Sequence, residues 1–223
     1  MFGPHINPRR LEDNYLKNMM ASPVKRGMVM LYGDSCFTRW QPLYGNVSAE
    51  DVLRSPDGSQ AVVNHGFGTS TAEELLYYYP MLVRPWAPRA LVLKAYGNDR
   101  GAGYSPMEII NLHARTMDYA RADFPGIKLY LFKVFPLLKS RDFDAAEKWA
   151  VKEYNDLVCA YAAAHPDVTL IDGVTMPGLY RDGDVGNPDA IRDELYIKDR
   201  VHFSPEGYAL FADFMRDQLK DVL

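Results

Sequence analysis

The strongest constraint on the fold is a regular alternation between short apolar runs and longer segments with helical spacing. The apolar runs end in turn residues and occupy residues 28–34, 61–66, 90–97, 128–136 and 168–173. Between them, apolar residues recur at helical spacing, as in 107–124 and 146–161. Strands that alternate with helices pair in parallel and carry helices on both faces. The pattern therefore predicts an α/β protein with a five-stranded parallel sheet.

Helix-start signals agree with this alternation. Ser70 and Ser105 each precede a glutamate by three residues, which is the spacing of a capping box. Pro106 favours the first helical position after Ser105. Ser204 followed by Pro205 predicts the start of a last helix near the carboxyl terminus.

Residues 1–27 differ from the rest because they carry prolines and charges and show little periodicity. We expect an N-terminal arm there, with a short helix around 11–20, packed on a main domain over 28–223. A chain of 223 residues is long enough for one α/β domain with a substantial core, and too short for two comfortable domains.

Composition excludes several classes of function. The net charge of −4 lacks the basic footprint of a nucleic-acid binder and gives no attraction to anionic membranes. The two cysteines are far apart and the five histidines are scattered, so no disulfide framework or metal site is expected. The first residues lack the apolar core of a signal peptide. We therefore expect a cytoplasmic protein, or a secreted one whose signal was removed.

The order of the predicted strands places several polar residues at one edge of the sheet. Ser35 follows the first strand, 66–71 the second and Asn98 the third. Parallel sheets carry their sites at the carboxyl ends of their strands. The segment 173–203 is long, irregular and rich in Gly, Asp and Pro, and loops of that length are usually functional or disordered.

Two short motifs supply the residue types of a serine hydrolase. Gly33-Asp34-Ser35 could expose a hydroxyl at a helix start, although Ser35 or Asp34 could equally serve as a helix cap. Asp199 and His202 have the spacing at which a carboxylate can orient an imidazole base, although such a pair also occurs in surface loops. The segment is not the nucleophile elbow of α/β-hydrolases, because Phe37 stands in place of its second glycine.

Two further segments could stabilise an oxyanion. The Asn98 amide, after the third strand, can donate hydrogen bonds to developing negative charge. Backbone N–H groups in 66–71 can do the same at the start of the following helix. Each segment also fits an ordinary turn, since Gly and Asn favour turn geometry.

Taken together, the motifs resemble those of the GDSL/SGNH hydrolases. The blocks are GDS at 33–35, N-x-G-x-G at 64–68, GND at 97–99 and D-x-x-H at 199–202, in the order and spacing of that family. The resemblance implies a flavodoxin-like, three-layer α/β/α sandwich. It also implies ester hydrolysis without a metal or an organic cofactor.

The resemblance assigns a role to each matching residue. It makes Ser35 the nucleophile, His202 the acid/base and Asp199 its partner. It makes Asn98 an oxyanion donor, together with the backbone N–H of Ser35.

The chain departs from the family pattern at two positions. The family usually has a glycine five residues after the Asn that ends the second strand, and here that position is Thr69. Either Thr69 or, if the loop shifts, Gly68 supplies the second backbone donor. Tyr96 replaces a small residue before the GND glycine, so its ring either narrows the pocket or packs in the core.

Four residues near these blocks are candidates for contacting the substrate. They are Asp34, His65, Tyr96 and Arg100. His65 has a structural role as its alternative, and Arg100 could meet an acidic substrate group or form a surface ion pair. Cys36 is expected to be packed rather than reactive.

The resulting hypothesis is a serine esterase that hydrolyses carboxylic esters through an acyl-enzyme. We expect short acyl groups, such as acetyl on carbohydrates, because no long apolar lid segment is present. The expected partner is thus a small-molecule or carbohydrate ester, not a nucleic acid or a membrane. An acyltransferase and a non-catalytic, carbohydrate-binding pseudo-hydrolase are the alternatives. The oligomeric state cannot be derived from the sequence.

Overall fold

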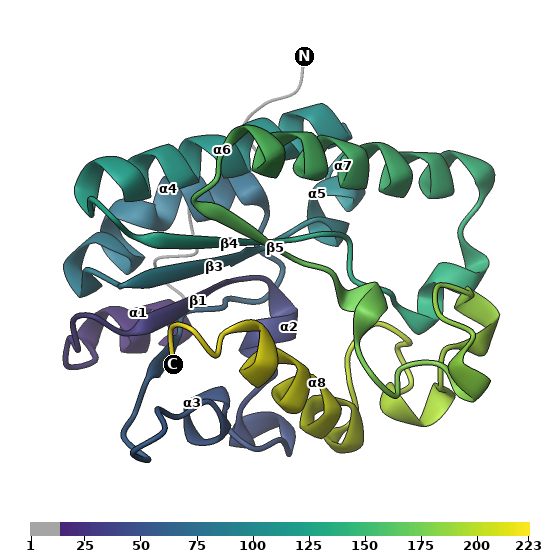
Figure 1. Cartoon of the computed structure of the whole chain (residues 1–223), viewed down its shortest axis with the longest axis horizontal. Coiled ribbons are helices and arrows are strands. Elements are labelled where there is room, and N and C mark those ends of the chain that lie inside the picture. Colours follow the sequence, from purple (N-terminus) through teal and green to yellow (C-terminus); the bar gives the residue numbers. More distant parts are fainter. Residues whose placement is uncertain (1–13) are drawn as a thin grey trace.

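The computed structural model describes residues 14–223, and these form a three-layer α/β/α arrangement (Figure 1). All five strands of the central sheet are parallel, in the order β2-β1-β3-β4-β5. They are β1 (Val29–Gly33), β2 (Val62–Asn64), β3 (Ala90–Lys94), β4 (Lys128–Phe132) and β5 (Val168–Ile171). The prediction of a five-stranded parallel sheet is confirmed, and β2, β1 and β3 lie side by side.

Helices cover both faces of this sheet (Figure 1). The helices packed against one face are α1 (Asn14–Ala21), α4 (Ala72–Leu82), α6 (Pro106–Asp123) and α7 (Ala145–Ala164). Those on the other face are α2 (Ser35–Thr38), α3 (Ala49–Val52) and α8 (Pro205–Gln218). The short helix α5 (Gly97–Gly101) follows β3.

The central strand β1 separates two apolar cores. Its residues Val29 and Leu31 face α8, whereas Met30 and Tyr32 face α4 and α6. Side chains alternate between the faces of a strand, and a strand covered on both faces is apolar throughout. All of β1 is buried for this reason, and its carboxyl end is held rigidly between the two helical layers.

Several strands end earlier than predicted. The third apolar run was expected to extend to Gly97, but β3 ends at Lys94, and Gly97 already belongs to α5. The backbone N–H of Asp34 bonds to the Lys94 carbonyl at 3.1 Å, and neither β1 nor β3 continues beyond that bond. The fourth run ends at Phe132 and then leaves the sheet before Pro136, which has no N–H to contribute to a ladder.

One predicted helix start is displaced by a residue. The cap of α4 is Thr71, which forms a capping box with Glu74, whereas Ser70 was expected to fill that role. The Ser70 hydroxyl instead donates to the Gly33 carbonyl at 3.1 Å and ties the loop after β2 to the end of β1. The capping box of Ser105 and the cap at Ser204 are confirmed.

The predicted N-terminal arm falls partly outside the described residues. Residues 1–13 lie outside the described residues, so the expected helix around 11–20 can be compared only from residue 14 onward. That stretch corresponds to α1. Leu16 and Met19 of α1 are buried in the core beside α4. The boundary between an arm (1–27) and a domain (28–223) stays a prediction.

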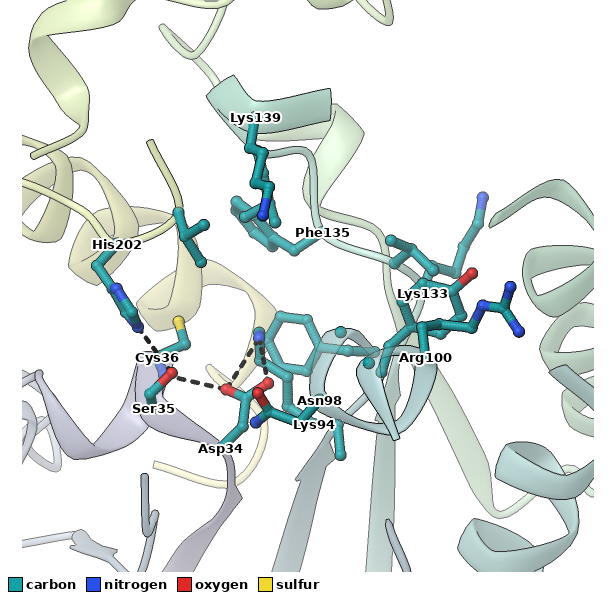
Figure 2. A pocket seen from close by; sticks show the side chains of 18 of the residues that line it. Asp34, Ser35, Cys36, Lys94, Asn98, Arg100, Lys133, Phe135, Lys139 and His202 are labelled. Atoms are coloured by element: carbon teal, nitrogen blue, oxygen red, sulfur yellow. Dashed lines mark hydrogen bonds and ion pairs between the residues drawn. The ribbon is translucent and has the colours of Figure 1, made fainter. Parts of the chain in front are cut away.

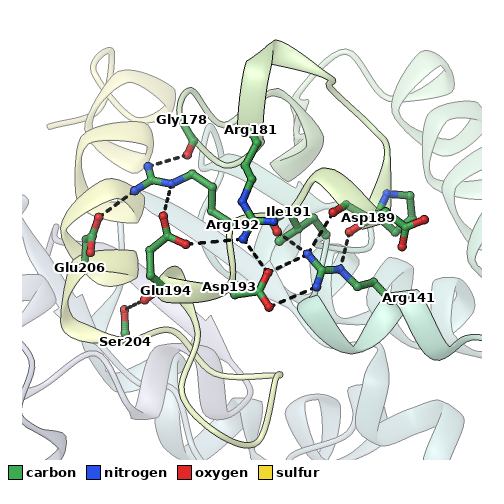
Figure 3. Close-up of polar contacts among 11 residues, drawn as sticks. Arg141, Gly178, Arg181, Asp189, Ile191, Arg192, Asp193, Glu194, Ser204 and Glu206 are labelled. Carbon is green, nitrogen blue, oxygen red and sulfur yellow. Dashed lines mark hydrogen bonds and ion pairs between the residues drawn. The ribbon is translucent and has the colours of Figure 1, made fainter.

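The irregular segment 173–203 is ordered by short 3₁₀ turns and arginine contacts (Figure 3). Its turns are η5 (Gly173–Thr175), η6 (Arg181–Gly183), η7 (Pro188–Ala190) and η8 (Asp193–Leu195). The remaining 3₁₀ turns are η2 (Pro42–Tyr44), η3 (Arg84–Trp86) and η4 (Leu138–Asp142). Between residues 14 and 223, no helix has the length and apolar character that crossing a membrane requires.

Candidate active site

The Ser35 hydroxyl is presented at the carboxyl end of the central strand. Ser35 is the first residue of α2, and the Asp34 carboxylate caps that helix by accepting the Cys36 N–H at 3.0 Å. Gly33 allows the turn to be tight, because a Cβ there would lie 2.4 Å from the Lys94 carbonyl oxygen. The first two residues of the GDS motif therefore have structural reasons, since Gly33 permits the turn and Asp34 caps the helix.

The structure brings Ser35, His202 and Asp199 into one hydrogen-bonded chain. His202 Nε2 lies 2.7 Å from Ser35 Oγ (Figure 2). On the other side of the ring, His202 Nδ1 lies 2.7 Å from Asp199 Oδ2. A carboxylate can only accept, so Nδ1 carries the hydrogen and Nε2 is left to accept the proton of the Ser35 hydroxyl. This arrangement can turn a weakly nucleophilic hydroxyl into a reactive one.

The Asp199 carboxylate is oriented by the loop that it belongs to. Its Oδ1 accepts the backbone N–H groups of Val201 and His202, both at 2.9 Å. Burial alone would raise the pKa of Asp199, but the hydrogen bonds from the His202 backbone, the His202 ring and Val201 outweigh burial and lower it. Asp199 therefore stays ionised at neutral pH and can stabilise a positively charged imidazole.

Arg200 connects this loop to the turn η4 across the cavity. Its backbone is left-handed, with a φ of 61°. The guanidinium bonds to Asp142 at 2.5 Å and to the Leu138 carbonyl at 3.2 Å. The backbone N–H of Lys139 returns a bond to the Arg200 carbonyl at 2.9 Å. A strained backbone at this point is thus held by three contacts from one neighbouring turn.

Ser35 and His202 open into a cavity of about 470 Å³ that Asn98 also lines. One amide hydrogen of Asn98 is used in a bond to the Ser70 carbonyl at 3.0 Å. This bond fixes the amide, and the second hydrogen is left for a ligand. Within the described part of the chain, the backbone N–H of Ser35 has no acceptor. Both groups can therefore donate to an oxygen in the cavity.

The second backbone donor predicted from the family pattern stays a prediction. Gly68 and Thr69 lie on the loop after β2 and are not among the residues that line the cavity. Thr69 has a φ of 60°, a conformation that favours glycine. A threonine therefore stands where the family usually has a glycine, and its backbone keeps the left-handed conformation that favours glycine.

Three of the four candidate substrate contacts line the cavity, and the polar atoms of two of them, Asp34 and Tyr96, are engaged by Lys94 and Glu147. Asp34 accepts the Lys94 ammonium at 3.1 Å on each of its oxygens. Burial would lower the pKa of Lys94, but the charge of Asp34, the neighbouring Cys36 and the hydrogen bonds to Asp34 together outweigh burial and raise it. The Tyr96 ring packs on Tyr154, with 4.9 Å between ring centroids, so it belongs to both the core and the cavity wall.

Arg100, the third candidate, also lines the cavity and forms an ion pair with Glu147 at 3.3 Å. Its other contact is the Tyr104 carbonyl at 2.7 Å. The ion pair, one of the two alternatives for this residue, is present in the cavity wall, and contact with an acidic substrate group stays a prediction.

His65, the fourth candidate, lies in the core and not on the cavity. It is 2% exposed, its Nδ1 is 2.7 Å from the Leu82 carbonyl, and its ring contacts Trp86 edge-on. Burial lowers the pKa of His65 to about 4, so the ring is neutral at physiological pH. The expectation that His65 touches the substrate is corrected, because its side chain points into the core and not into the cavity.

Cys36 also lines the cavity, next to Ser35. Burial raises the pKa of its thiol to about 12. The thiolate is the nucleophilic form of cysteine, so this side chain is unreactive at neutral pH, as expected.

The cavity also contains lysines that sequence analysis did not single out. Lys94, Lys133 and Lys139 all line it. One signal was available for Lys94, since a lysine that ends a buried apolar strand needs a charged partner. No local pattern marked the other two, which follow β4 in an irregular segment. No cluster of His, Cys, Asp or Glu that could hold a metal ion occurs within residues 14–223.

Comparison with known proteins identifies the family. The sequence profile of the GDSL-like lipase/acylhydrolase family matches residues 31–210. No curated protein matches the chain in sequence.

Solved structures with the same fold include three bacterial proteins. A candidate acylhydrolase from Bacteroides fragilis NCTC 9343 shares 19% identity and a TM-score of 0.71, covering 97% of this chain and 99% of its own. A GDSL-like lipase from Bacteroides thetaiotaomicron VPI-5482 shares 21% and 0.68, covering 94% and 97%. The psychrotrophic esterase EstA from Pseudoalteromonas sp., in a form inhibited by monoethylphosphonate, shares 15% and 0.66, covering 87% and 97%. The protein belongs to the GDSL-like lipase/acylhydrolase family.

Proposed function

We propose that the protein is a serine ester hydrolase that acts through an acyl-enzyme, with Ser35, His202 and Asp199 as its catalytic triad. The observation that carries the proposal is the hydrogen-bonded chain of two 2.7 Å contacts that ends at a hydroxyl in the cavity. Membership of the family supports ester hydrolysis as the reaction.

The proposed reaction assigns each of these groups a step. Ser35 Oγ attacks the ester carbonyl carbon while His202 Nε2 takes the hydroxyl proton, and Asp199 stabilises the resulting imidazolium. The oxyanion accepts hydrogen bonds from the Ser35 N–H, the Asn98 amide and the backbone N–H of Gly68 or Thr69. His202 then protonates the leaving alcohol. Water, activated by the same imidazole, attacks the acyl-enzyme and releases the acid.

As the substrate we propose short acyl groups, such as acetyl, carried by carbohydrates. A cavity of about 470 Å³ is of the size that takes a small ligand. Its wall combines aromatic rings, such as Phe135 and Phe143, with charged side chains, which suits a polar ester better than a long alkyl chain. Acyl transfer differs only in the acceptor, because an alcohol then replaces the water.

The test is a variant that removes the nucleophile. Ser35→Ala should fold normally and lose nearly all hydrolysis of 4-nitrophenyl acetate, since the residual rate then comes from binding and oxyanion contacts alone. Ser22→Ala, at an exposed position directly after α1, is the matched control. An ethyl phosphonate ester should add one phosphonyl group to the native protein and none to Ser35→Ala. Full activity in a pure, folded Ser35→Ala protein would overturn the proposal.

Two further measurements separate the alternatives. Addition of a sugar alcohol to the assay should leave free acid as the main product if water is the acceptor, whereas an acyltransferase would form a new ester. A protein that binds acetylated sugars but shows neither turnover nor phosphonylation would be a binding module.

A further inference from the structure

The cavity gathers more positive charge than the chain as a whole suggests. Four cationic side chains line it, namely Lys94, Arg100, Lys133 and Lys139, against the two carboxylates of Asp34 and Glu147. The whole chain has a net charge of −4. Positive charge is therefore concentrated around Ser35 on a protein that is acidic overall, and such a cleft attracts anions.

Three of these cations are neutralised by nearby carboxylates. Lys94 is paired with Asp34 at 3.1 Å, and Arg100 with Glu147 at 3.3 Å. Lys133 Nζ lies 2.5 Å from Asp172, which is outside the cavity wall. A ligand would have to compete with these partners for each of the three charges.

Lys139 differs from them, because its ammonium has no ion pair or hydrogen bond within residues 14–223. Its side chain extends from the turn η4 into the cavity that contains Ser35 and His202 (Figure 2). Its backbone is fixed there, because its N–H bonds to the Arg200 carbonyl, two residues before His202. The charge is thus available to a ligand, and the position of its Cα relative to His202 is set by the fold.

We propose that this cavity selects ester substrates that carry an anionic group, such as a carboxylate, and that Lys139 is the side chain that binds it. The proposal rests on the proposed ester hydrolysis and names the substrate class of the same site. A free, partly solvated ammonium can bind an anion without losing an existing partner. The anionic group can lie on the acyl part or on the alcohol part, since both occupy the cavity beside Ser35.

The test uses pairs of esters that differ by one charge. For the acyl part, 4-nitrophenyl hemisuccinate is compared with 4-nitrophenyl succinamate. For the alcohol part, 4-acetoxybenzoate is compared with 4-acetoxybenzamide. The measured quantity is the ratio of kcat/KM between the anionic and the neutral member of each pair. The variants are Lys139→Met, which keeps the length of the side chain, and Lys139→Glu, which reverses its charge.

A suitable control is Lys128→Met. Lys128 is also exposed, but it begins β4 at the opposite end of the sheet from the cavity. Circular dichroism and a thermal melt of each variant show that it is folded.

We expect the native enzyme to favour the anionic member of at least one pair. The pair in which this preference is found shows whether the acyl part or the alcohol part of the substrate carries the charge. Lys139→Met should lower that ratio about fivefold, the size expected for one partly exposed ion pair. Lys139→Glu should invert the preference, and Lys128→Met should leave the ratio unchanged. The native ratio should also shrink as salt is added.

Two results would overturn the proposal in different ways. If neutral esters are hydrolysed but the native ratio is near one in both pairs, or does not respond to Lys139, the anion selectivity is wrong and ester hydrolysis stands. If no member of either pair is hydrolysed, the proposed function fails together with the selectivity.

Discussion

Ser35 and His202 lie 2.7 Å apart, yet the segments that carry them are held by different forces. Ser35 follows β1, every residue of which is buried between two apolar cores. His202 lies in an irregular segment, 173–203, that reaches the apolar core through Leu179, Ile191 and Leu195 but is also held by arginine contacts to Asp193 and Glu206. We call these the sheet wall and the polar wall of the cavity.

The polar wall consists of contacts between three arginines and their partners (Figure 3). Arg141, from η4, binds the Asp193 carboxylate at 2.9 Å and the carbonyls of Pro188 and Ile191. Arg192 bridges the segment to α8 through Glu206 at 2.9 Å. The third, Arg181, also binds Asp193, at 2.8 Å.

The difference between the two walls predicts the conditions under which each loses its structure. Apolar packing is not screened by salt, and it is lost only when the core is disrupted. Ion pairs and hydrogen bonds near the surface are individually weak and are screened by salt. We therefore expect the polar wall to open first under salt or denaturant, which would remove His202 from a Ser35 that stays in place.

The largest expected effect comes from the carboxylate of the polar wall. Asp199→Asn keeps an oxygen for the Val201 and His202 N–H groups but no longer fixes the His202 tautomer or stabilises its positive form. We predict a fall in kcat of roughly a thousandfold or more, measured with 4-nitrophenyl acetate. Asp213→Asn, on the exposed side of α8, is the control. A loss below tenfold would mean that Asp199 only shapes the loop.

The second-largest effect is expected from a substitution in the sheet wall. Asn98→Ala removes a side-chain donor and leaves the Ser35–His202 contact intact. We predict a fall in kcat of about a hundredfold with little change in KM, because the oxyanion is present only in the transition state. Steady-state kinetics of Asn98→Ala and of the exposed control Asn18→Ala provide the test. A change confined to KM would assign Asn98 to substrate binding instead.

A smaller effect should follow when the polar wall is loosened without touching the triad. Arg141→Met removes the contacts to Asp193 and to the carbonyls of 188 and 191. We predict a loss of about 2 kcal/mol in the free energy of unfolding, and faster amide hydrogen exchange in 186–193 than in β1. Arg54→Met, whose contacts are local, is the control. Uniform exchange across the molecule would show that the two walls open together.

The smallest effect is expected at Thr69. Thr69→Gly relieves a left-handed threonine and keeps the backbone N–H, while glycine raises the entropy of the unfolded chain. We predict a kcat within about threefold of the native value and a change in unfolding free energy below about 1 kcal/mol. Ala87→Gly, at the left-handed end of η3, controls for the backbone effect. A tenfold fall in kcat would show that the Thr69 side chain takes part in the reaction.

Much of the sheet wall could be predicted from the sequence. Apolar period, turn residues and caps are local properties, so the order of strands and the positions of Ser35 and Asn98 followed from short segments. The error at the start of α4 arose from a long-range contact. Ser70 was expected to cap α4, but its hydroxyl bonds to Gly33, which lies 37 positions away.

His65 shows why chain proximity does not place a side chain. It lies between Asn64 and Gly66, and Asn64 bonds to the carbonyl of Phe37 beside the GDS turn. In extended chain, adjacent side chains point to opposite sides. His65 therefore faces Leu82 and Trp86 in the core.

By itself, the sequence determined the alternation of strands and helices, the edge at which the motifs meet, and the residue types of the proposed triad. Only the tertiary structure decided which charged side chains in and around the cavity are paired. Lys94 is neutralised by Asp34, Arg200 is tied to η4, and Lys139 is left without a partner within residues 14–223. The contacts of Lys94 and Arg200 join residues 58 to 62 positions apart. No local pattern encodes a partner at that distance, because the partner is chosen by how the strand ends and loops pack together.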